Sequence, residues 1–268
     1  MRSSTSISAP ETFLRDAIKY DMRAYGAVTS WTGVTYIGAS PRGICIVRLP
    51  LWNDATRKPQ LRQSETHVEQ AGDNSAEAYL CQGLRELGEY FDGTREQFAV
   101  PLDLRGPAFF QRVWHAVASV LYGETRTYAD IARELGVPNA TRAVGAANGS
   151  NPVAPFVPCH RIVGSNGGLT GYGPGLPLKR HLLAMERAIP VDAESVDVWR
   201  AEVARRLGTP ELMIGVRPTR QYCRSGCGRW RKYLDVPPRL FASPSAAEAA
   251  GFTACAACRS EQPALFSA

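Results

Sequence analysis

The 268-residue chain has no apolar run near the ~18 residues that a membrane-spanning helix needs. Residues 1–5 lack the apolar stretch of a secretory signal, and the acidic residues Glu11 and Asp16 soon follow. No internal repeat is visible, and low complexity is confined to the Ala-rich residues 245–250. These absences argue against a membrane or repeat protein, and they predict a soluble intracellular protein with no membrane partner.

The seven cysteines are an odd number, so they cannot all pair in a disulfide framework. Four of them cluster after residue 220, whereas Cys45 and Cys81 lie in apolar runs and are predicted to be buried. The length suits two or three small domains. The formal charge of +6 and a pI near 9.0 fit a nucleic-acid partner, although many soluble proteins carry such an excess without one.

The first hundred residues predict a small α/β domain. A short helix is expected over 10–20, strands over 28–36 and 44–49 in a hairpin broken at 38–43, and a polar surface loop over 53–75. A longer helix is expected over residues 76–91 because apolar residues recur there at helical spacing. Its buried stripe should consist of Ala78, Cys81, Leu84, Leu87 and Phe91.

The next segment predicts a cluster of helices. Gly106-Pro107 opens a helix with an apolar face, and Thr127-x-x-Asp130 is typical of a capping box at the start of a second helix. Gly136 should end that helix, and Asn139 should cap a third that runs to about residue 148. This outline fits a helix-turn-helix as well as any tight helical hairpin. The first of these helices should bury Phe110, Val113, Trp114, Val117 and Leu121.

The third of these helices is built from small residues around one long cation, Arg142. A helix with small side chains can approach a nucleic-acid groove closely, and one arginine could then hold open an unstacked base step. Small residues equally suit close helix–helix packing. The small residues of this helix are Ala140, Ala143, Gly145, Ala146 and Ala147.

Pro158-Cys159-His160 places a candidate nucleophile on a proline corner beside a candidate base. Only the thiolate of a cysteine is strongly nucleophilic, and an imidazole can take its proton directly or through water. A carboxylate elsewhere must orient the imidazole, and Glu186 is the candidate, although spacing alone does not bring it to His160. A bare Cys-His pair is more often a packed cysteine beside a surface histidine.

A longer pattern resembles the O6-alkylguanine-DNA alkyltransferases over about residues 105–188. Residues 28–100 fit that family's amino-terminal domain only loosely. The matching motifs, in order, are Gly123-Glu124, Thr127-Tyr128, Arg142-Ala143-Val144-Gly145, Asn151-Pro152, Pro158-Cys159-His160-Arg161, Gly171-Tyr172-Gly173 and Lys179 through Glu186.

The resemblance implies a role for each matching residue. Cys159 would accept the alkyl group, and His160 and Glu186 would relay its proton. Asn151 would support the loop, and Tyr128 would lie by the phosphate 3′ of the lesion and protonate the departing guanine. The residues expected to contact DNA are Tyr128, Arg142, Ala140, Ala143 and Arg161. Those expected to line the base pocket are Val157 and residues 165–173, with Tyr172 and Gly173, where relatives often have serine in place of this last glycine.

Two close cysteine pairs near the carboxyl end, Cys223-x-x-x-Cys227 and Cys255-x-x-Cys258, have the spacing of a tetrahedral zinc site with four thiolates. No organic cofactor is expected. The surrounding segment resembles the zinc domain of the bacterial Ada adaptive-response protein, in which the residue matching Cys223 also accepts methyl groups from phosphotriesters. Ser225 and Ala254 replace prolines of that family's pattern. A structural DNA-contacting module and a second repair centre at Cys223 both remain open.

The residue patterns and the resemblance together imply a cytoplasmic, nucleoid-associated monomer of the α/β (α+β) class that binds double-stranded DNA. It would move an alkyl group from O6 of guanine to Cys159 once only, and O4 of thymine is left open as a second substrate. A methylation-responsive DNA-binding sensor is the main alternative. A damage-recognition protein without alkyl transfer and a cysteine hydrolase are weaker ones. The predicted units are a sheet domain over 1–103, a catalytic and DNA-binding domain over 104–190, a helical linker over 191–209 and a zinc module over 210–260.

Overall fold

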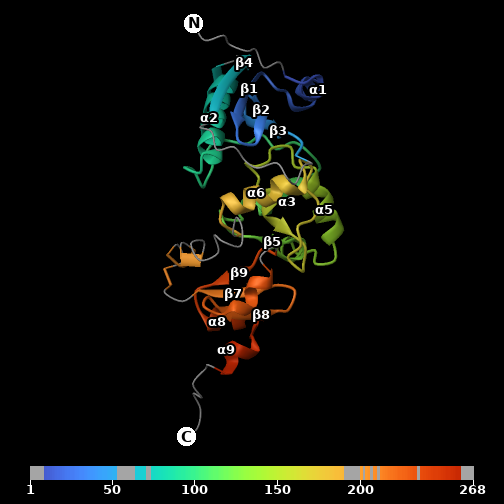
Figure 1. The fold of residues 1–268 in the computed structure, drawn as a ribbon. Helices are drawn as coiled ribbons and strands as arrows, with labels where there is room; N and C mark the ends of the chain where they lie inside the picture. Colours follow the sequence, from blue (N-terminus) through green and yellow to red (C-terminus); the bar gives the residue numbers. More distant parts are fainter. Residues whose placement is uncertain are drawn as a thin grey trace.

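The computed structural model describes residues 9–52, 64–70, 74–189, 200–201, 203–205, 208–209, 212–233 and 236–260. Its elements fall into three groups that follow one another along the chain and along the long axis of the molecule (Figure 1). The mixture of helices and sheets confirms the predicted α/β class. Among the described residues, no helix is both long and apolar enough to cross a membrane.

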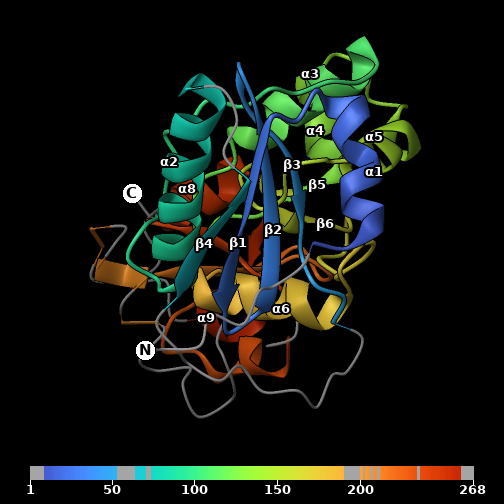
Figure 2. The same cartoon turned by 90° about the horizontal axis from the view of Figure 1, so that it is seen from above.

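The first group is a four-stranded antiparallel sheet in the order β3-β2-β1-β4, with one helix against each face. Phe13 of α1 packs with Ala27, Tyr36 and Cys45 on one face, whereas Leu84 of α2 belongs to the main core on the other. Figure 2 shows the two helices flanking the sheet. The elements are α1 (Glu11–Tyr20), β1 (Ala24–Ser30), β2 (Gly33–Ser40), β3 (Gly43–Arg48), β4 (Glu65–Gln70) and α2 (Asn74–Phe91).

The predicted hairpin is a three-stranded meander, because the chain turns once more than expected. The Ser30 hydroxyl accepts a hydrogen bond from the Thr32 N–H at 3.2 Å, and Gly33 follows with φ +110°. This hydroxyl turn splits the expected strand over 28–36. The expected loop over 53–75 contains β4, an edge strand whose described side chains, those of residues 65–68, are exposed. Residues 53–63 and 71–73 lie outside the described part.

Helix α2 begins two residues before the predicted start, and its buried stripe is rotated from the predicted one. Ala78 and Cys81 are exposed, so the prediction that Cys81 is buried is wrong, whereas Cys45 is buried as expected. The buried stripe instead carries Ala76, Leu80, Gly83, Leu84, Glu86, Leu87, Gly88, Tyr90 and Phe91. The rotation brings Tyr90 inside the protein.

The second group holds the predicted helical cluster. Thr127 and Asp130 form the expected capping box at the start of α4, and Gly136 ends the helix with φ +74°. The expected cap at Asn139 is wrong, because α5 is preceded by Ala140, which makes no side-chain cap, and Leu121 is exposed rather than buried. The elements are α3 (Ala108–Ala118), β5 (Arg126–Thr127), α4 (Tyr128–Glu134), α5 (Thr141–Gly149), η1 (Cys159–Arg161), β6 (Ile162–Val163) and α6 (Leu176–Met185).

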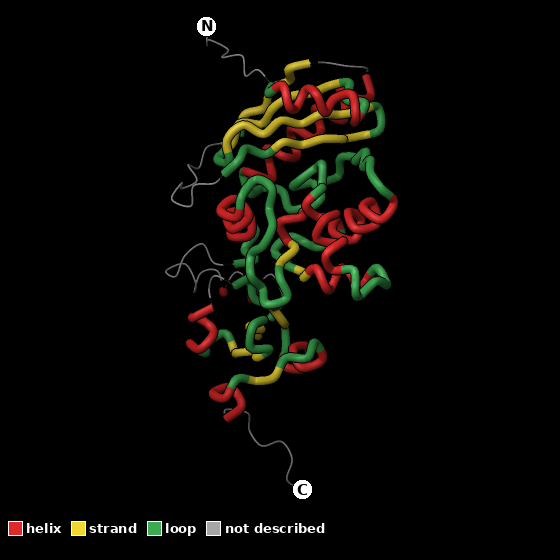
Figure 3. Tube along the Cα trace, turned by 90° about the vertical axis from the view of Figure 1, so that its right-hand side faces the viewer, coloured by secondary structure: helices red, strands yellow, loops and turns green. Residues whose placement is uncertain are grey.

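The third group is a small sheet in the order β10-β8-β7-β9 with short helices around it (Figure 3). Among the described helical residues 200–201 and 203–205, Val203 packs into the core of this module. Residues 191–199, 202, 206 and 207 of the predicted linker lie outside the described part. The elements are β7 (Met213–Val216), β8 (Gln221–Arg224), η2 (Gly228–Tyr233), β9 (Arg239–Phe241), α8 (Pro244–Ala249), β10 (Thr253–Ala254) and α9 (Ala256–Ser260).

Candidate active site and metal centre

Cys159 begins the short helical turn η1, directly after Pro158 and before β6. Its side chain is 5% exposed and lines a cavity of about 240 Å³. The Asn148 amide donates to the Cys159 carbonyl at 3.3 Å, which ties the turn to the end of α5. The thiol is therefore nearly buried at the wall of a cavity that a single base could enter.

His160 and Glu186, 26 residues apart in sequence, meet in the interior. His160 Nε2 lies 2.9 Å from Glu186 Oε1, and both side chains are fully buried. An ionised carboxylate only accepts hydrogen bonds, so Nε2 of the neutral ring carries the hydrogen and Nδ1 is left as the acceptor. Nδ1 is buried and makes no hydrogen bond within the described structure. The ring thus has a free basic nitrogen beside the cysteine that precedes it.

Arg161 does not face DNA, and the expectation that it does is wrong. The guanidinium is 5% exposed, with Nε and Nη2 at 2.8 Å from the two oxygens of Glu186. Its Nη1 donates to the Val120 carbonyl at 2.6 Å. This bidentate pair fixes the carboxylate that orients His160.

Sequence reasoning missed Tyr90, which α2 delivers from the amino-terminal domain. The Tyr90 hydroxyl donates to Glu186 Oε1 at 2.6 Å and lies 3.5 Å from His160 Nε2. The one signal in the sequence is that Tyr90 lies at helical spacing on the buried side of α2. Its apolar neighbours on that side make it look like an ordinary core residue. Glu186 therefore receives hydrogen bonds from Tyr90, His160 and Arg161, three residues of two domains.

The electrostatics of the site favour a neutral thiol and a neutral imidazole at rest. Burial raises the pKa of Cys159, against the opposing effects of a hydrogen bond with Asn151 and the charge of Lys179. Burial likewise lowers the pKa of His160. Burial alone would raise the pKa of Glu186, but the interactions and hydrogen bonds with His160 and Arg161 outweigh it and hold that pKa well below its ordinary value.

Lys179 is a second residue that the sequence analysis did not single out for a role. Its ammonium is fully buried in α6 and donates to the carbonyls of Ile162 at 2.6 Å and Thr170 at 2.8 Å. Burial lowers its pKa to about 8, so a charged lysine contributes a positive potential near the thiol at neutral pH. It also ties β6 to the loop that follows.

Asn151 is placed as expected, at the base of the cysteine loop. Its amide donates to the Val157 carbonyl at 2.7 Å, and its carbonyl oxygen accepts from the Val153 N–H at 3.1 Å. These two bonds hold residues 151–157 in a compact turn. The loop therefore presents Cys159 rigidly to the cavity.

The cavity lining agrees only in part with the expected pocket. Tyr172 and Gly173 line it as expected, but Val157 is fully buried and does not. Residues 47–49 and Leu51 of the amino-terminal domain form another part of the wall, which the sequence did not indicate. The Val47 N–H donates to Pro152 O at 2.7 Å and the Trp52 N–H to Pro174 O at 2.7 Å, so the sheet domain holds both sides of the pocket.

The face around α5 carries the remaining expected DNA contacts. Arg142 and Ala143 are exposed, and Ala140 and Tyr128 are half-buried. The Tyr128 hydroxyl donates to the Thr170 carbonyl at 3.4 Å, and burial raises its pKa. The side chain of Tyr128 therefore lies between the helix-turn-helix and the pocket loop.

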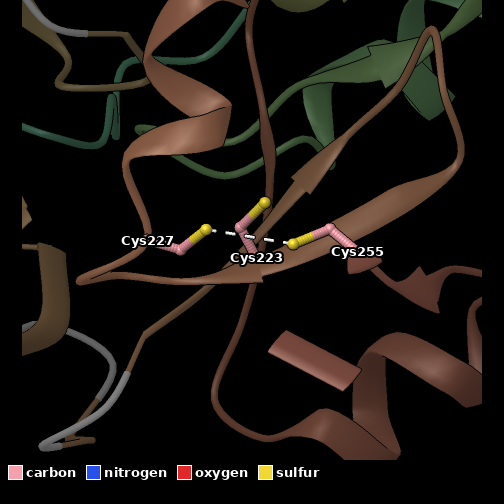
Figure 4. A group of neighbouring side chains, drawn as sticks. All are labelled: Cys223, Cys227 and Cys255. Carbon is pink, nitrogen blue, oxygen red and sulfur yellow. Dashed lines mark hydrogen bonds between the residues drawn. The ribbon is translucent and has the colours of Figure 1, made fainter. Parts of the chain in front are cut away.

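The carboxyl-terminal cysteines gather as a metal site requires. The sulfur atoms of Cys223, Cys227 and Cys255 lie within 4.8 Å of one another, and those of Cys227 and Cys255 are 3.9 Å apart (Figure 4). Thiolates bound tetrahedrally at about 2.3 Å would stand about 3.8 Å apart, so these three residues fit zinc. Cys258, the fourth expected ligand, is buried close by and accepts a hydrogen bond from the Arg224 N–H at 3.3 Å.

Two family models match the chain. Residues 108–188 match the DNA-binding domain of 6-O-methylguanine DNA methyltransferase, and residues 197–261 match the metal-binding domain of Ada. The second match begins before residue 210 and agrees with the placement of Val203 in the module core.

Several methylated-DNA–protein-cysteine methyltransferases are similar in sequence. The chain is 55% identical over 104 residues to that of Mycolicibacterium paratuberculosis, covering 39% of this chain and 63% of the relative. It is 52% identical over 113 residues to that of Mycobacterium bovis, covering 42% and 68%.

A solved structure extends the likeness to the amino-terminal sheet domain. The crystal structure of Mycobacterium tuberculosis O6-methylguanine methyltransferase is 38% identical, with a TM-score of 0.50, and the match covers 65% of this chain and 98% of that one. The buried Cys-His-Glu cluster beside a helix-turn-helix agrees with these matches. The chain belongs to the methylated-DNA–protein-cysteine methyltransferase family and carries an Ada-type metal-binding domain after its repair domain.

Proposed function

We propose that this protein repairs DNA by transferring the alkyl group of O6-alkylguanine to Cys159. The observation that carries the proposal is the buried cluster of Cys159, His160 and Glu186, in which Cys159 lines a base-sized cavity. The protein would act as a monomer on double-stranded DNA in the cytoplasm, where the chromosome lies.

The proton of the thiol would move to His160 Nδ1, directly or through a water molecule. Glu186 would keep the ring in the correct tautomer and stabilise the imidazolium, while Arg161 and Tyr90 keep the carboxylate ionised and fixed. The low pKa of Glu186 argues that the proton stays on the ring and is not passed on. Lys179 would favour the thiolate as it forms.

The thiolate would then attack the alkyl carbon in line with O6. A sulfur–carbon bond forms as the carbon–oxygen bond breaks, and the departing guanine takes up one proton. The Tyr128 hydroxyl, at the rim of the pocket, is the proposed donor. The resulting thioether has no route of reversal in the site, so each molecule would act once.

The alkylated base must leave the duplex to reach the buried thiol. Extrusion costs a few kcal/mol, which binding along the duplex has to offset. Arg142 on α5 is exposed and would occupy the space left in the stack, with the small side chains of Ala140 and Ala143 allowing the helix to lie close to the groove.

The metal module is proposed to bind one zinc ion through Cys223, Cys227, Cys255 and Cys258. Zinc would stabilise the fold of a module too small to be stable on its core alone. Cys223 is 2% exposed, which favours a structural role for its sulfur over attack on a methyl phosphotriester. Ser225 and Ala254, which replace prolines of the Ada-type pattern, agree with this reading.

The proposal can be tested by measuring the loss of O6-methylguanine from DNA. A duplex with a single O6-methylguanine would be mixed with increasing amounts of wild-type protein, and the remaining methylguanine counted after digestion. The proposal predicts that one lesion disappears per protein molecule, without further turnover, and that Cys159→Ala removes none. Continued turnover, or loss of lesions with Cys159→Ala, would refute it.

A further inference from the structure

A buried arginine of the metal module contacts the repair domain. Arg217 opens the turn that joins β7 to β8, and it is 7% exposed. Its Nη2 donates to both the carbonyl oxygen and the hydroxyl of Thr125 at 2.9 Å, and its Nε donates to Pro237 O at 3.2 Å. Figure 1 shows β5, the strand after Thr125, at the end of the repair domain that adjoins β7 and β9.

Thr125 lies directly before a strand that is joined to the Cys159 turn. It precedes β5, which pairs in parallel with β6, the strand that directly follows the Cys159 turn. Tyr128 and Asp130 lie one turn further on, in α4. Burial lowers the pKa of Arg217 to about 10, against the attraction of Asp130, so the guanidinium stays charged at neutral pH and faces this carboxylate.

A second contact reaches the loop that lines the pocket. A Cβ atom on Gly167 would stand 2.4 Å from Val236 Cγ1 and 3.1 Å from Arg217 Cδ, so the backbone of this turn lies directly against the module. The turn continues into residues 171–173, which line the cavity of Cys159. The module thus touches both chain segments that border β5 and β6.

The same hairpin connects this contact to the metal centre. Cys223 lies on β8 opposite Ile214 of β7, and Arg217 is in the turn between the two strands. Because a module of this size depends on its metal to fold, the position of Arg217 depends on the metal as well. Loss of the metal should release the arginine from Thr125.

We propose that the metal module is an internal brace for the alkyl-acceptor site, in which Arg217 and Gly167 hold the β5–β6 pair and the pocket loop in their reactive positions. This inference rests on the proposed function for its kinetic consequence. It gives the module a task that requires no chemistry at Cys223: alkyl transfer at Cys159 becomes dependent on metal bound at the far end of the molecule. A misplacement of about 1 Å at a reacting centre is enough to slow a reaction substantially.

The test compares two variants of the full-length, zinc-loaded protein, Arg217→Met and Arg229→Met. Both remove one positive charge from the module, but Arg229 is exposed. With saturating O6-methylguanine duplex, we expect Arg217→Met to transfer the methyl group about tenfold more slowly and Arg229→Met to stay within about twofold of wild type. Zinc content should remain one ion per chain in both.

Hydrogen exchange gives a readout that needs no substrate. Amides of residues 164–173 should exchange faster in Arg217→Met and after zinc is removed from the wild type by a chelator, but not in Arg229→Met. Thr125→Val, which removes only the hydroxyl acceptor, should show a smaller change in the same direction. Wild-type exchange and a wild-type rate in Arg217→Met would overturn the brace. If the wild-type protein does not react at all, the proposed function is refuted. The hydrogen-exchange rates of residues 164–173 would then test by themselves whether the module braces the pocket loop.

Discussion

At the residue scale, the site depends on one carboxylate that serves several neighbours. Glu186 binds Arg161 with both oxygens, orients His160 and accepts from Tyr90, all without contact with water. A buried charge of this kind is tolerated only because it is paired and fully hydrogen-bonded. Removal of any one partner therefore leaves a buried charge or polar group without its full set of hydrogen bonds, which destabilises the fold.

Tyr90→Phe should separate positioning from packing. The change removes one hydrogen bond to a buried carboxylate, which we expect to cost about 2 kcal/mol of stability. The carboxylate then attracts the proton of His160 more strongly, so the acid limb of the alkyl-transfer rate should move to higher pH. The measurement is the single-turnover rate from pH 5 to 8. Tyr122→Phe, which loses a bond to the Met185 carbonyl, is the matched control and should leave the limb in place.

Glu186→Gln should lower the free energy of unfolding at pH 7 by about 3–5 kcal/mol, because it leaves Arg161 buried without its anion. The pKa of Glu186 is held below its ordinary value of 4.5, so its stabilising effect is complete above pH 4.5 and is lost as the pH falls below it. The wild-type advantage over the variant should therefore shrink by about 1 kcal/mol between pH 7 and pH 3.5 in urea unfolding. An advantage that grows as the pH falls would contradict the assigned ionisation.

At the element scale, α5 combines a buried side with an exposed reading side. Val144 and Ala147 pack inward, and Arg142 and Ala143 face outward. Arg142→Ala should slow methyl transfer from duplex DNA by about tenfold or more, since it loses the group proposed to fill the vacated stack. The same variant should react normally with the free methylated base, which needs no extrusion. Arg133→Ala, on the exposed side of α4, is the control, and equal losses in both variants would point to simple charge loss.

Elements with local signals could be predicted from the sequence. The capping box of Thr127 and Asp130 and the helical spacing in α2 and α3 placed three helices to within a few residues. The turn at residues 31–32 could not be predicted because Trp31 and Thr32 are residue types that favour β-strands. Strand β4 was missed because an edge strand can be polar on both faces.

The catalytic cluster could be predicted in part. The cysteine loop and Glu186 are marked by motif, but Tyr90 and Arg161 acquire their roles only when α2 and α6 pack against the same turn. From the sequence of a basic protein, Arg161 is expected to contact phosphate, and only the structure shows that it pairs with the buried Glu186. The pocket wall from residues 47–49 and Leu51 is likewise a product of tertiary packing.

At the scale of the whole molecule, the repair part and the metal module each have a hydrophobic core of their own. Chelation of the metal should therefore unfold the module while the larger core survives, because only the smaller core contains the cysteine cluster. Hydrogen exchange should show loss of protection over residues 212–258 and retention in α2 and α3. Simultaneous unfolding of both parts would contradict this division.

Cys159 is the proposed acceptor of the alkyl group. The most direct measurement is the intact mass of the protein after incubation with an O6-methylguanine duplex, followed by peptide mapping, with a methyl-phosphotriester duplex in parallel. We expect a gain of one methyl group, located on Cys159 and absent in Cys159→Ala, and no gain on Cys223 from either duplex. Tight DNA binding without any mass gain, or a methyl group on another residue, would contradict it.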